Sequence, residues 1–136
     1  MQIHIIVYVH GDRCRCRRLF APPSIGFQLA ARTPVCHQVS VIHPPLESVY
    51  PTTKADLICL IFGRVFARQA YQLASQLTGQ GKRVVMGGGF VTRHPEEALA
   101  YCEAVLIGAL ETVWPRLLSD ANMGKLHRYY KNEAVH

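Results

Sequence analysis

The segment that most constrains the fold is an apolar strand that ends in three consecutive glycines and is followed by a helix. Val84 to Met86 is the apolar part, Gly87 to Gly89 are the glycines, and Pro95 opens the helical pattern. Glycine has no Cβ, so this backbone can lie flush against a ligand or adopt a positive φ. In α/β proteins, ligands bind at the carboxyl ends of parallel strands. The segment therefore predicts either a cofactor-binding turn or a strand-to-helix turn that needs small residues.

Apolar strand patterns and helical patterns alternate along the rest of the chain. We expect strands at Ile3–Val9, Val39–Ile42, Ala55–Phe62, Lys82–Met86 and Ala104–Ile107, and helices at Ser24–Ala31, Val65–Gln80, Pro95–Tyr101 and Glu111–Met123. This alternation predicts a three-layer, flavodoxin-like (Rossmann-like) α/β domain with a five-stranded parallel sheet. The 136 residues fit a single domain, with a polar tail from about residue 124 that is expected to pack loosely.

The composition is that of a globular protein, with 49% hydrophobic and 18% charged residues. No apolar run approaches the roughly 20 residues that a membrane helix needs. No basic region precedes the apolar N-terminal segment, as it would in a signal peptide. We therefore expect a cytoplasmic protein with no membrane partner.

Four arginines contribute much of the formal net charge of +6. They are Arg13, Arg15, Arg17 and Arg18. Such a cluster can meet phosphate, nucleic acid or an acidic partner. Few aromatic residues are interleaved with it, and no helix-turn-helix or zinc-finger spacing occurs elsewhere. We expect a solvated loop, or a loop that grips the phosphate of a ligand, and not a nucleic-acid interface.

The five cysteines do not favour a disulfide framework, because their number is odd and the expected compartment is reducing. Cys14 and Cys16 lie among the arginines, which would lower a thiol pKa. A metal site there would need further ligands at suitable spacing, and none is nearby. Cys59 and Cys102 lie in apolar segments and are expected in the core.

Five segments of the chain share their residues, in order, with a known family. They are Ala21–Gly26 with Leu29–Ala31, His37–Val39, Ala55–Ile58 with Ala70–Ala74, Val84–Ala98, and Ala104–Gly108 continuing through Glu111, Trp114–Pro115, Leu117–Leu118, Asp120, Gly124 and Leu126. The chain thereby resembles the cobalamin-binding domain found at the N-terminus of many radical S-adenosylmethionine enzymes. The resemblance covers nearly the whole chain, and Val84–Leu118 is its most specific block. It implies a corrinoid on the carboxyl edge of the sheet, in a slot with a few polar anchors.

The cofactor-binding residues that this resemblance implies follow the strands. They are Gly11 and Asp12 after the first strand, Phe62 and Gly63 after the third, Gly87, Gly88, Gly89, Phe90 and Thr92 after the fourth, and Gly108 and Glu111 after the fifth. Gly87 and Gly88 would let backbone approach the nucleotide tail, and the first loop would lie beneath or beside the corrin ring. Asp12 would bond a corrin amide or cap a turn. Glu111 would cap the last helix or face the ligand edge.

Four positions depart from the pattern of the family: Ile61, Arg64, Phe90 and Ala109. Relatives usually carry serine, threonine, histidine and glutamate there. Each hydrogen bond lost at a buried site costs roughly 0.5–1.5 kcal/mol, so these departures either weaken cobalamin binding or change the ligand. Carriage of a corrinoid survives if the four positions line an open groove. It does not survive if Phe90 and Arg64 fill that groove.

Two motifs that carry chemistry in related proteins are absent. The first loop has Asp12-Arg13-Cys14 where methyl-transfer carriers have Asp-x-His-x-x-Gly, so the histidine axial ligand of that motif is missing. The C-x-x-x-C-x-x-C motif that holds the cluster of radical enzymes is also missing. No Ser–His–acid set or pair of carboxylates stands out, so no catalytic residue is assigned.

We therefore expect a non-enzyme: a corrinoid carrier domain that serves a partner radical S-adenosylmethionine enzyme. The alternative is a degenerate domain without cofactor that acts in protein interaction or regulation. A response-regulator-like or flavin-binding domain is a third interpretation. It is weakened because no aspartate ends the third strand and no Ser/Thr-rich phosphate loop follows the first.

Overall fold

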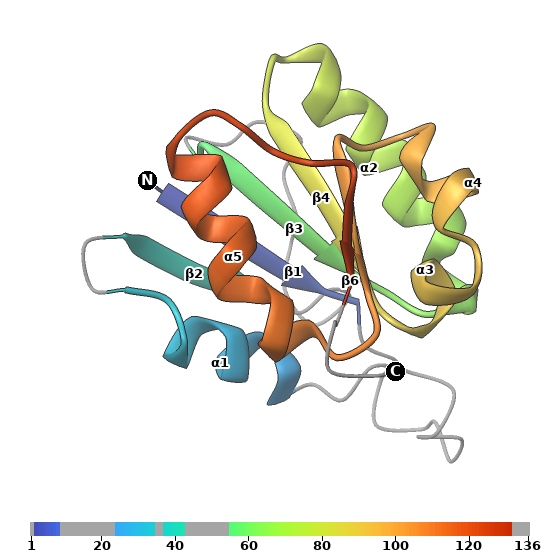
Figure 1. The fold of residues 1–136 in the computed structure, drawn as a ribbon. Helices are drawn as coiled ribbons and strands as arrows, with labels where there is room; N and C mark the ends of the chain where they lie inside the picture. The colour runs from blue at the N-terminus through green and yellow to red at the C-terminus, as the bar shows by residue number, and fades with distance from the viewer. Residues whose placement is uncertain (1, 9–23, 35–36, 43–54, 132–136) are drawn as a thin grey trace.

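The computed structural model describes residues 2–8, 24–34, 37–42 and 55–131, and in them one parallel sheet of six strands runs in the order β2-β1-β3-β4-β5-β6 (Figure 1). The strands are β1 (Gln2–Val7), β2 (Gln38–Ile42), β3 (Leu57–Ile61), β4 (Arg83–Gly87), β5 (Ala104–Ile107) and β6 (Tyr129–Lys131). The helices are α1 (Ser24–Ala31), α2 (Ala67–Gly79), α3 (Gly89–Arg93), α4 (Pro95–Leu99) and α5 (Leu110–Asn122), with a 3-10 turn, η2, at Arg64–Phe66.

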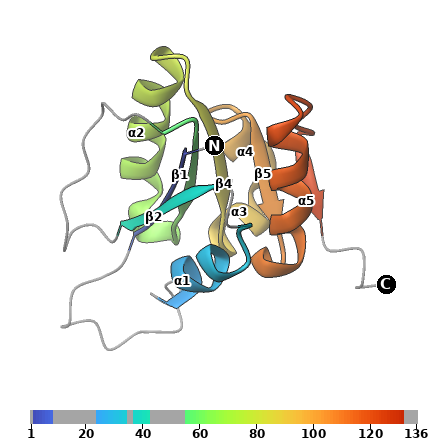
Figure 2. The same ribbon diagram turned by 90° about the vertical axis from the view of Figure 1, so that its left-hand side faces the viewer.

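Helices cover both faces of the sheet and make three layers (Figures 1 and 2). α1 and α5 pack on one face, in a core that includes Leu29 and Trp114. α2, α3 and α4 pack on the other, around Leu73 and Met86. All residues of β3 are buried, because helices cover a parallel sheet on both sides. The flavodoxin-like α/β fold predicted from the alternation is confirmed.

A sixth strand corrects the predicted strand count. The tail beyond residue 124 was expected to pack loosely, yet Tyr129–Lys131 pairs in parallel with Val105–Ile107. Tyr130 at its centre is fully buried. A single apolar side chain among polar neighbours is too weak a pattern to predict a strand, and here packing against α5 holds the strand in place.

The connection through α5 has the opposite hand to the connection through α2. Both connections step in the same direction across the sheet, from β3 to β4 and from β5 to β6. Their helices nevertheless lie on opposite faces, and nearly all such crossovers in proteins share one hand. Trp114 helps to hold α5 on the α1 face, since its Nε1–H donates to Thr33 Oγ1 at 3.0 Å.

None of the helices in the described residues has the length and apolar character to cross a membrane.

Candidate functional site

The order of the strands creates a switch point between β1 and β3. From there β2 lies on one side, and β3, β4 and β5 follow on the other. Loops that diverge at such a point leave a crevice at the carboxyl ends of the strands, where ligands bind in open α/β sheets. The Tyr8 N–H donates to Ile61 O at 2.9 Å, so the two strands stay paired up to this edge. The predicted residues Gly11 and Asp12 belong to the first loop, outside the described residues.

The backbones that leave β3 and β4 come closest at Phe62 and Gly88. Gly88 has φ 118° and ψ 176°, a conformation essentially restricted to glycine. A Cβ at Gly88 would lie 2.6 Å from the carbonyl oxygen of Phe62. The Phe62 N–H donates to Gly87 O at 3.4 Å. The approach of the chain to itself therefore requires glycine at position 88, whatever binds at the edge.

The glycines on either side of Gly88 differ in what surrounds them. A Cβ at Gly87 would lie 2.8 Å from Cδ2 of Leu110, so Gly87 makes room for α5. A Cβ at Gly89 would meet nothing within 4 Å, and Gly89 is exposed. Gly89 also opens α3, a short helix where the sequence predicted a turn. Of the three glycines, Gly89 is the most exposed, whereas Gly88 is half-buried and Gly87 is buried.

An aromatic layer lies beneath the carboxyl edge on the α2 face. The ring of Phe62 is fully buried and lies edge-on to the ring of Tyr71, with a centroid distance of 5.8 Å. Its centroid lies 6.2 Å from that of Phe90. Tyr8 is nearly as buried and lies 5.6 Å from Phe66, centroid to centroid. Burial raises the pKa of Tyr8 to about 12, so its phenol is neutral at physiological pH. Phe62 has no exposed surface, so it supports the edge from beneath and does not contact a ligand.

Sequence reasoning did not single out Tyr8, Phe66 and Tyr71 for this edge. The available signal was weak, because each residue lies in an apolar segment and reads as ordinary core. Their shared position, after the end of β1, at the end of η2 and near the start of α2, becomes visible only once the parallel register is known.

Thr92 ties the polar rim of the edge together. Its Oγ1 accepts a hydrogen bond from the Gly108 N–H at 3.1 Å and donates to Gly88 O at 2.9 Å. The loop after β5 is thereby joined to α3. Glu111 lies in the first turn of α5, where a carboxylate interacts favourably with the helix dipole. The structure brings Phe62, Gly63, Gly87, Gly88, Gly89, Phe90, Thr92, Gly108 and Glu111 to one edge of the sheet.

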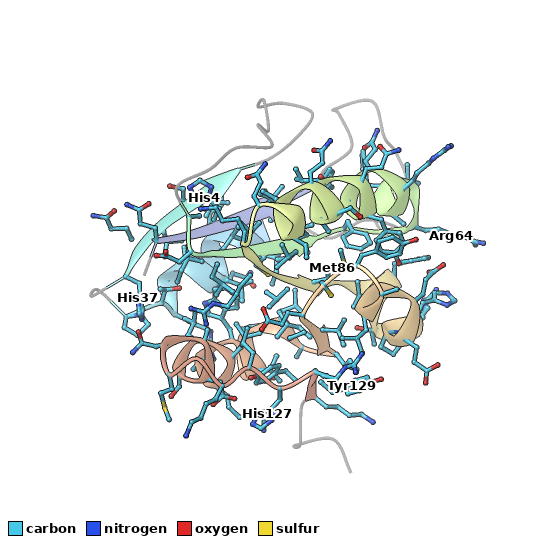
Figure 3. All side chains as sticks on the ribbon, turned by 90° about the horizontal axis from the view of Figure 1, so that it is seen from above. His4, His37, Arg64, Met86, His127 and Tyr129 are labelled. Atoms are coloured by element: carbon cyan, nitrogen blue, oxygen red, sulfur yellow. The ribbon has the colours of Figure 1, made fainter. Side chains whose placement is uncertain are left out.

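The four positions that depart from the family pattern have different environments. Ile61 is fully buried, whereas Ala109 is exposed at the N-cap of α5. Arg64 is exposed, and Figure 3 shows it at the margin of the molecule and directed away from the core. Phe90 is half-buried between Phe62 and His94, and the ring centroids of Phe90 and His94 are 4.7 Å apart. Arg64 therefore does not fill the edge, while Phe90 partly covers it.

Two open hollows on the described surface lie away from this edge. One, of about 520 Å³, is lined by Arg116, Asp120, His127, Arg128 and Tyr129. The other, of about 480 Å³, is lined by Ser75, Thr78, Lys82, Val84, Ala100, Tyr101, Cys102 and Glu103. Neither contains a residue predicted for cofactor binding.

The described cysteines offer no reactive thiol. Cys59 is fully buried, as predicted, and burial raises the pKa of Cys102 to about 12. Within the described ranges, no three His, Cys, Asp or Glu side chains are grouped to hold a metal ion. Cys14 and Cys16 lie outside those ranges.

Two curated proteins are similar to part of this chain. The bacteriochlorophyllide d C-8(2)-methyltransferase of Chlorobaculum tepidum is 26% identical over 106 residues, which are 77% of this chain and 24% of that protein. The bacteriochlorophyllide d C-12(1)-methyltransferase of the same organism is 33% identical over 76 residues, which are 56% of this chain and 17% of that protein. No family model matches the chain. The chain thus spans about a quarter or less of the length of these relatives.

These relatives overturn the expectation that the chain is not an enzyme. Both are methyltransferases, so the similarity points to enzymes. The expectation rested on the absence of the cluster-binding cysteine motif and of hydrolytic residue sets. That absence has no force for a chain that matches 24% and 17% of the length of its relatives.

Proposed function

We propose that this chain is the corrinoid-binding part of a radical S-adenosylmethionine methyltransferase and that it holds the corrinoid at the carboxyl edge of its sheet. Similarity over 77% of the chain to a methyltransferase supports the class. The resemblance of Val84–Leu118 to cobalamin-binding domains supports the ligand. The observation that carries the proposal is the position of this block: its glycines follow β4 at the carboxyl edge, next to β3, which borders the switch point where open sheets bind ligands.

The described residues fit a corrinoid in chemical character. Gly89 and Gly108 present exposed backbone, and Thr92 and Glu111 supply polar groups at the rim. The exposed side chain of Val65, within η2, adds apolar surface. Such an edge suits a large, mostly apolar ligand that carries amide groups on its margin.

The residues of this chain would bind and orient the ligand. The chemistry that a bound corrinoid supplies is methyl transfer. Thr92 fixes the loop after β5 against α3, so the rim is preformed before the ligand arrives. The aromatic layer around Phe62 excludes water beneath the edge, since its rings are packed against one another. Phe90, half-buried on that layer, is the side chain that would lie against the bound ligand.

Titration of the chain with hydroxocobalamin and methylcobalamin tests the proposal. Visible absorbance and calorimetry should report binding at micromolar concentration or tighter, with a spectrum unlike that of histidine-ligated cobalamin. Gly89→Leu should weaken binding by about tenfold or more, because it places a side chain in the open space at the edge.

The matched control for this titration is Gly79→Leu. A Cβ at Gly79 also meets nothing within 4 Å, and Gly79 ends α2 just before β4 begins, at the end of the sheet opposite the carboxyl edge. Its affinity for cobalamin should equal that of the wild type. Absence of binding at high cobalamin concentration, or equal weakening in both variants, would reject corrinoid binding at this edge and favour the interaction or regulatory role.

A further inference from the structure

A basic hollow lies between α5 and β6, outside the predicted cofactor edge. Its volume is about 520 Å³, and its lining contains two arginines, one histidine, one tyrosine and one aspartate. Figure 3 shows His127 and Tyr129 on the same side of the molecule, near α5. Nothing in the proposed corrinoid function uses these residues.

The one acidic group of the hollow is engaged in holding β6 to α5. Asp120 Oδ2 accepts a hydrogen bond from the Tyr130 hydroxyl at 2.7 Å and lies 3.7 Å from His127 Nε2. The Tyr130 hydroxyl in turn accepts from the His127 N–H at 2.9 Å. One carboxylate oxygen is thus engaged within the fold, and the lining of the hollow holds two guanidinium groups against this single carboxylate.

The positions of the two arginines follow from the same packing. Arg116 Cζ lies 5.3 Å from the centroid of the Tyr130 ring, in a cation–π arrangement that keeps the guanidinium near β6. Arg128 directly precedes β6 and its carbonyl oxygen accepts from the Val105 N–H at 2.9 Å. One cation comes from α5 and one from the residue just before β6, and both line the hollow.

β6 is the border strand of the described sheet, with β5 on its inner side (Figure 2). Backbone groups alternate in direction along a strand. Because the Arg128 carbonyl points to β5, the backbone groups of Tyr129 point to the outer side of the sheet. The Tyr129 side chain is 46% exposed, and Lys131 is exposed on the same strand. Such a border is a template for pairing with another chain.

We propose that the β6 border, formed by Arg116, Arg128, Tyr129 and Lys131, binds an extended acidic segment of a partner protein. Backbone pairing beside Tyr129 would add the segment to the sheet, as in other strand-addition complexes. Carboxylates of the segment would be bound by the arginines, whose planar groups match a carboxylate with two hydrogen bonds. A small anion would use the arginines but leave the backbone of Tyr129 unpaired, so a peptide uses more of this surface.

Binding of a synthetic Glu-Val-Glu-Val-Glu-Val peptide to the 136-residue chain tests the proposal, measured by fluorescence anisotropy and by amide chemical shifts. The shifts should centre on β6, and a Lys-Val-Lys-Val-Lys-Val peptide should not bind. Arg128→Glu should weaken binding by about tenfold or more. Arg68→Glu makes the same charge change at an exposed site of α2 on the other face and should change affinity by less than about twofold.

Two further probes separate strand addition from attraction of charge alone. A peptide N-methylated at alternate residues keeps its charge but loses backbone donors, and it should bind at least about tenfold more weakly. Inorganic phosphate should not displace the acidic peptide at equal concentration. Equal binding of the N-methylated peptide, displacement by phosphate, equal effects of Arg68→Glu and Arg128→Glu, or no binding of the acidic peptide would each overturn the proposal. None of these outcomes depends on cobalamin.

Discussion

The carboxyl ends of β3 and β4 and the junction of β6 with α5 are joined by opposite means. At Phe62 and Gly88 two backbones approach so closely that no side chain fits between them. At the junction of β6, the hydroxyl of Tyr130 bridges Asp120 and the backbone of His127. The contact at Gly88 requires that no Cβ be present, whereas the contact at β6 requires the hydroxyl of Tyr130. The first should therefore tolerate no substitution, and the second should tolerate a conservative one at modest cost.

Gly88→Ala should have the largest effect on stability. The new Cβ would meet the Phe62 carbonyl and would force alanine into a backbone region that it rarely adopts. We expect a loss of about 3 kcal/mol in the free energy of unfolding. Urea denaturation followed by circular dichroism measures this loss.

Gly89→Ala is the control, because Gly89 lies in α3 and a Cβ there would meet nothing within 4 Å. It should leave stability unchanged or raise it by up to about 1 kcal/mol. Equal losses in the two variants would show that the close contact between Phe62 and Gly88 does not distinguish these glycines.

Tyr130→Phe should have an intermediate effect. It keeps the buried ring but removes the hydroxyl that donates to Asp120 and accepts from His127. We expect a loss of about 1.5 kcal/mol. Hydrogen exchange should quicken most at the Val105 amide, which pairs with the strand that Tyr130 holds.

Tyr129→Phe is the matched variant one position away, where the side chain is largely exposed. Its stability should stay within about 0.5 kcal/mol of the wild type. If both variants lost the same stability, the bridge at Tyr130 would not be what fastens β6.

Thr92→Val should have the smallest effect of the three. It removes the oxygen that accepts from the Gly108 N–H, but this N–H is at an exposed position and water can replace the partner. The expected loss is about 0.5–1 kcal/mol. Thr92→Ser retains the oxygen and should recover most of the lost free energy of unfolding in the same urea measurement. If the serine variant were no more stable than the valine variant, this hydrogen bond would not have the proposed role.

The sequence predicted the positions of the candidate site better than the reasons for them. The glycines after β4 were expected to make room for a ligand, and they do lie at the carboxyl edge. Gly87 and Gly88 are nevertheless explained by Leu110 and Phe62, which are 23 and 26 positions away along the chain (110 minus 87 and 88 minus 62). The local sequence predicts a turn that needs small residues. It does not show which distant residues make glycine necessary at each position. The accessible glycine, Gly89, could be distinguished from them only in three dimensions.

Local pattern by itself determined the order and type of most elements, because apolar runs and helical periodicity are properties of neighbouring residues. It thereby determined the three layers and the edge at which the loops meet. The tertiary structure alone decided the sixth strand, since Tyr130 becomes a core residue only when α5 lies behind it. It also decided the opposite hand of the α5 connection and the aromatic layer of Tyr8, Phe62 and Tyr71. The sixth strand, the hand of the α5 connection and the aromatic layer have one physical reason in common. Each depends on burial against residues remote in the chain, and the neighbouring residues in the sequence carry no information about such contacts.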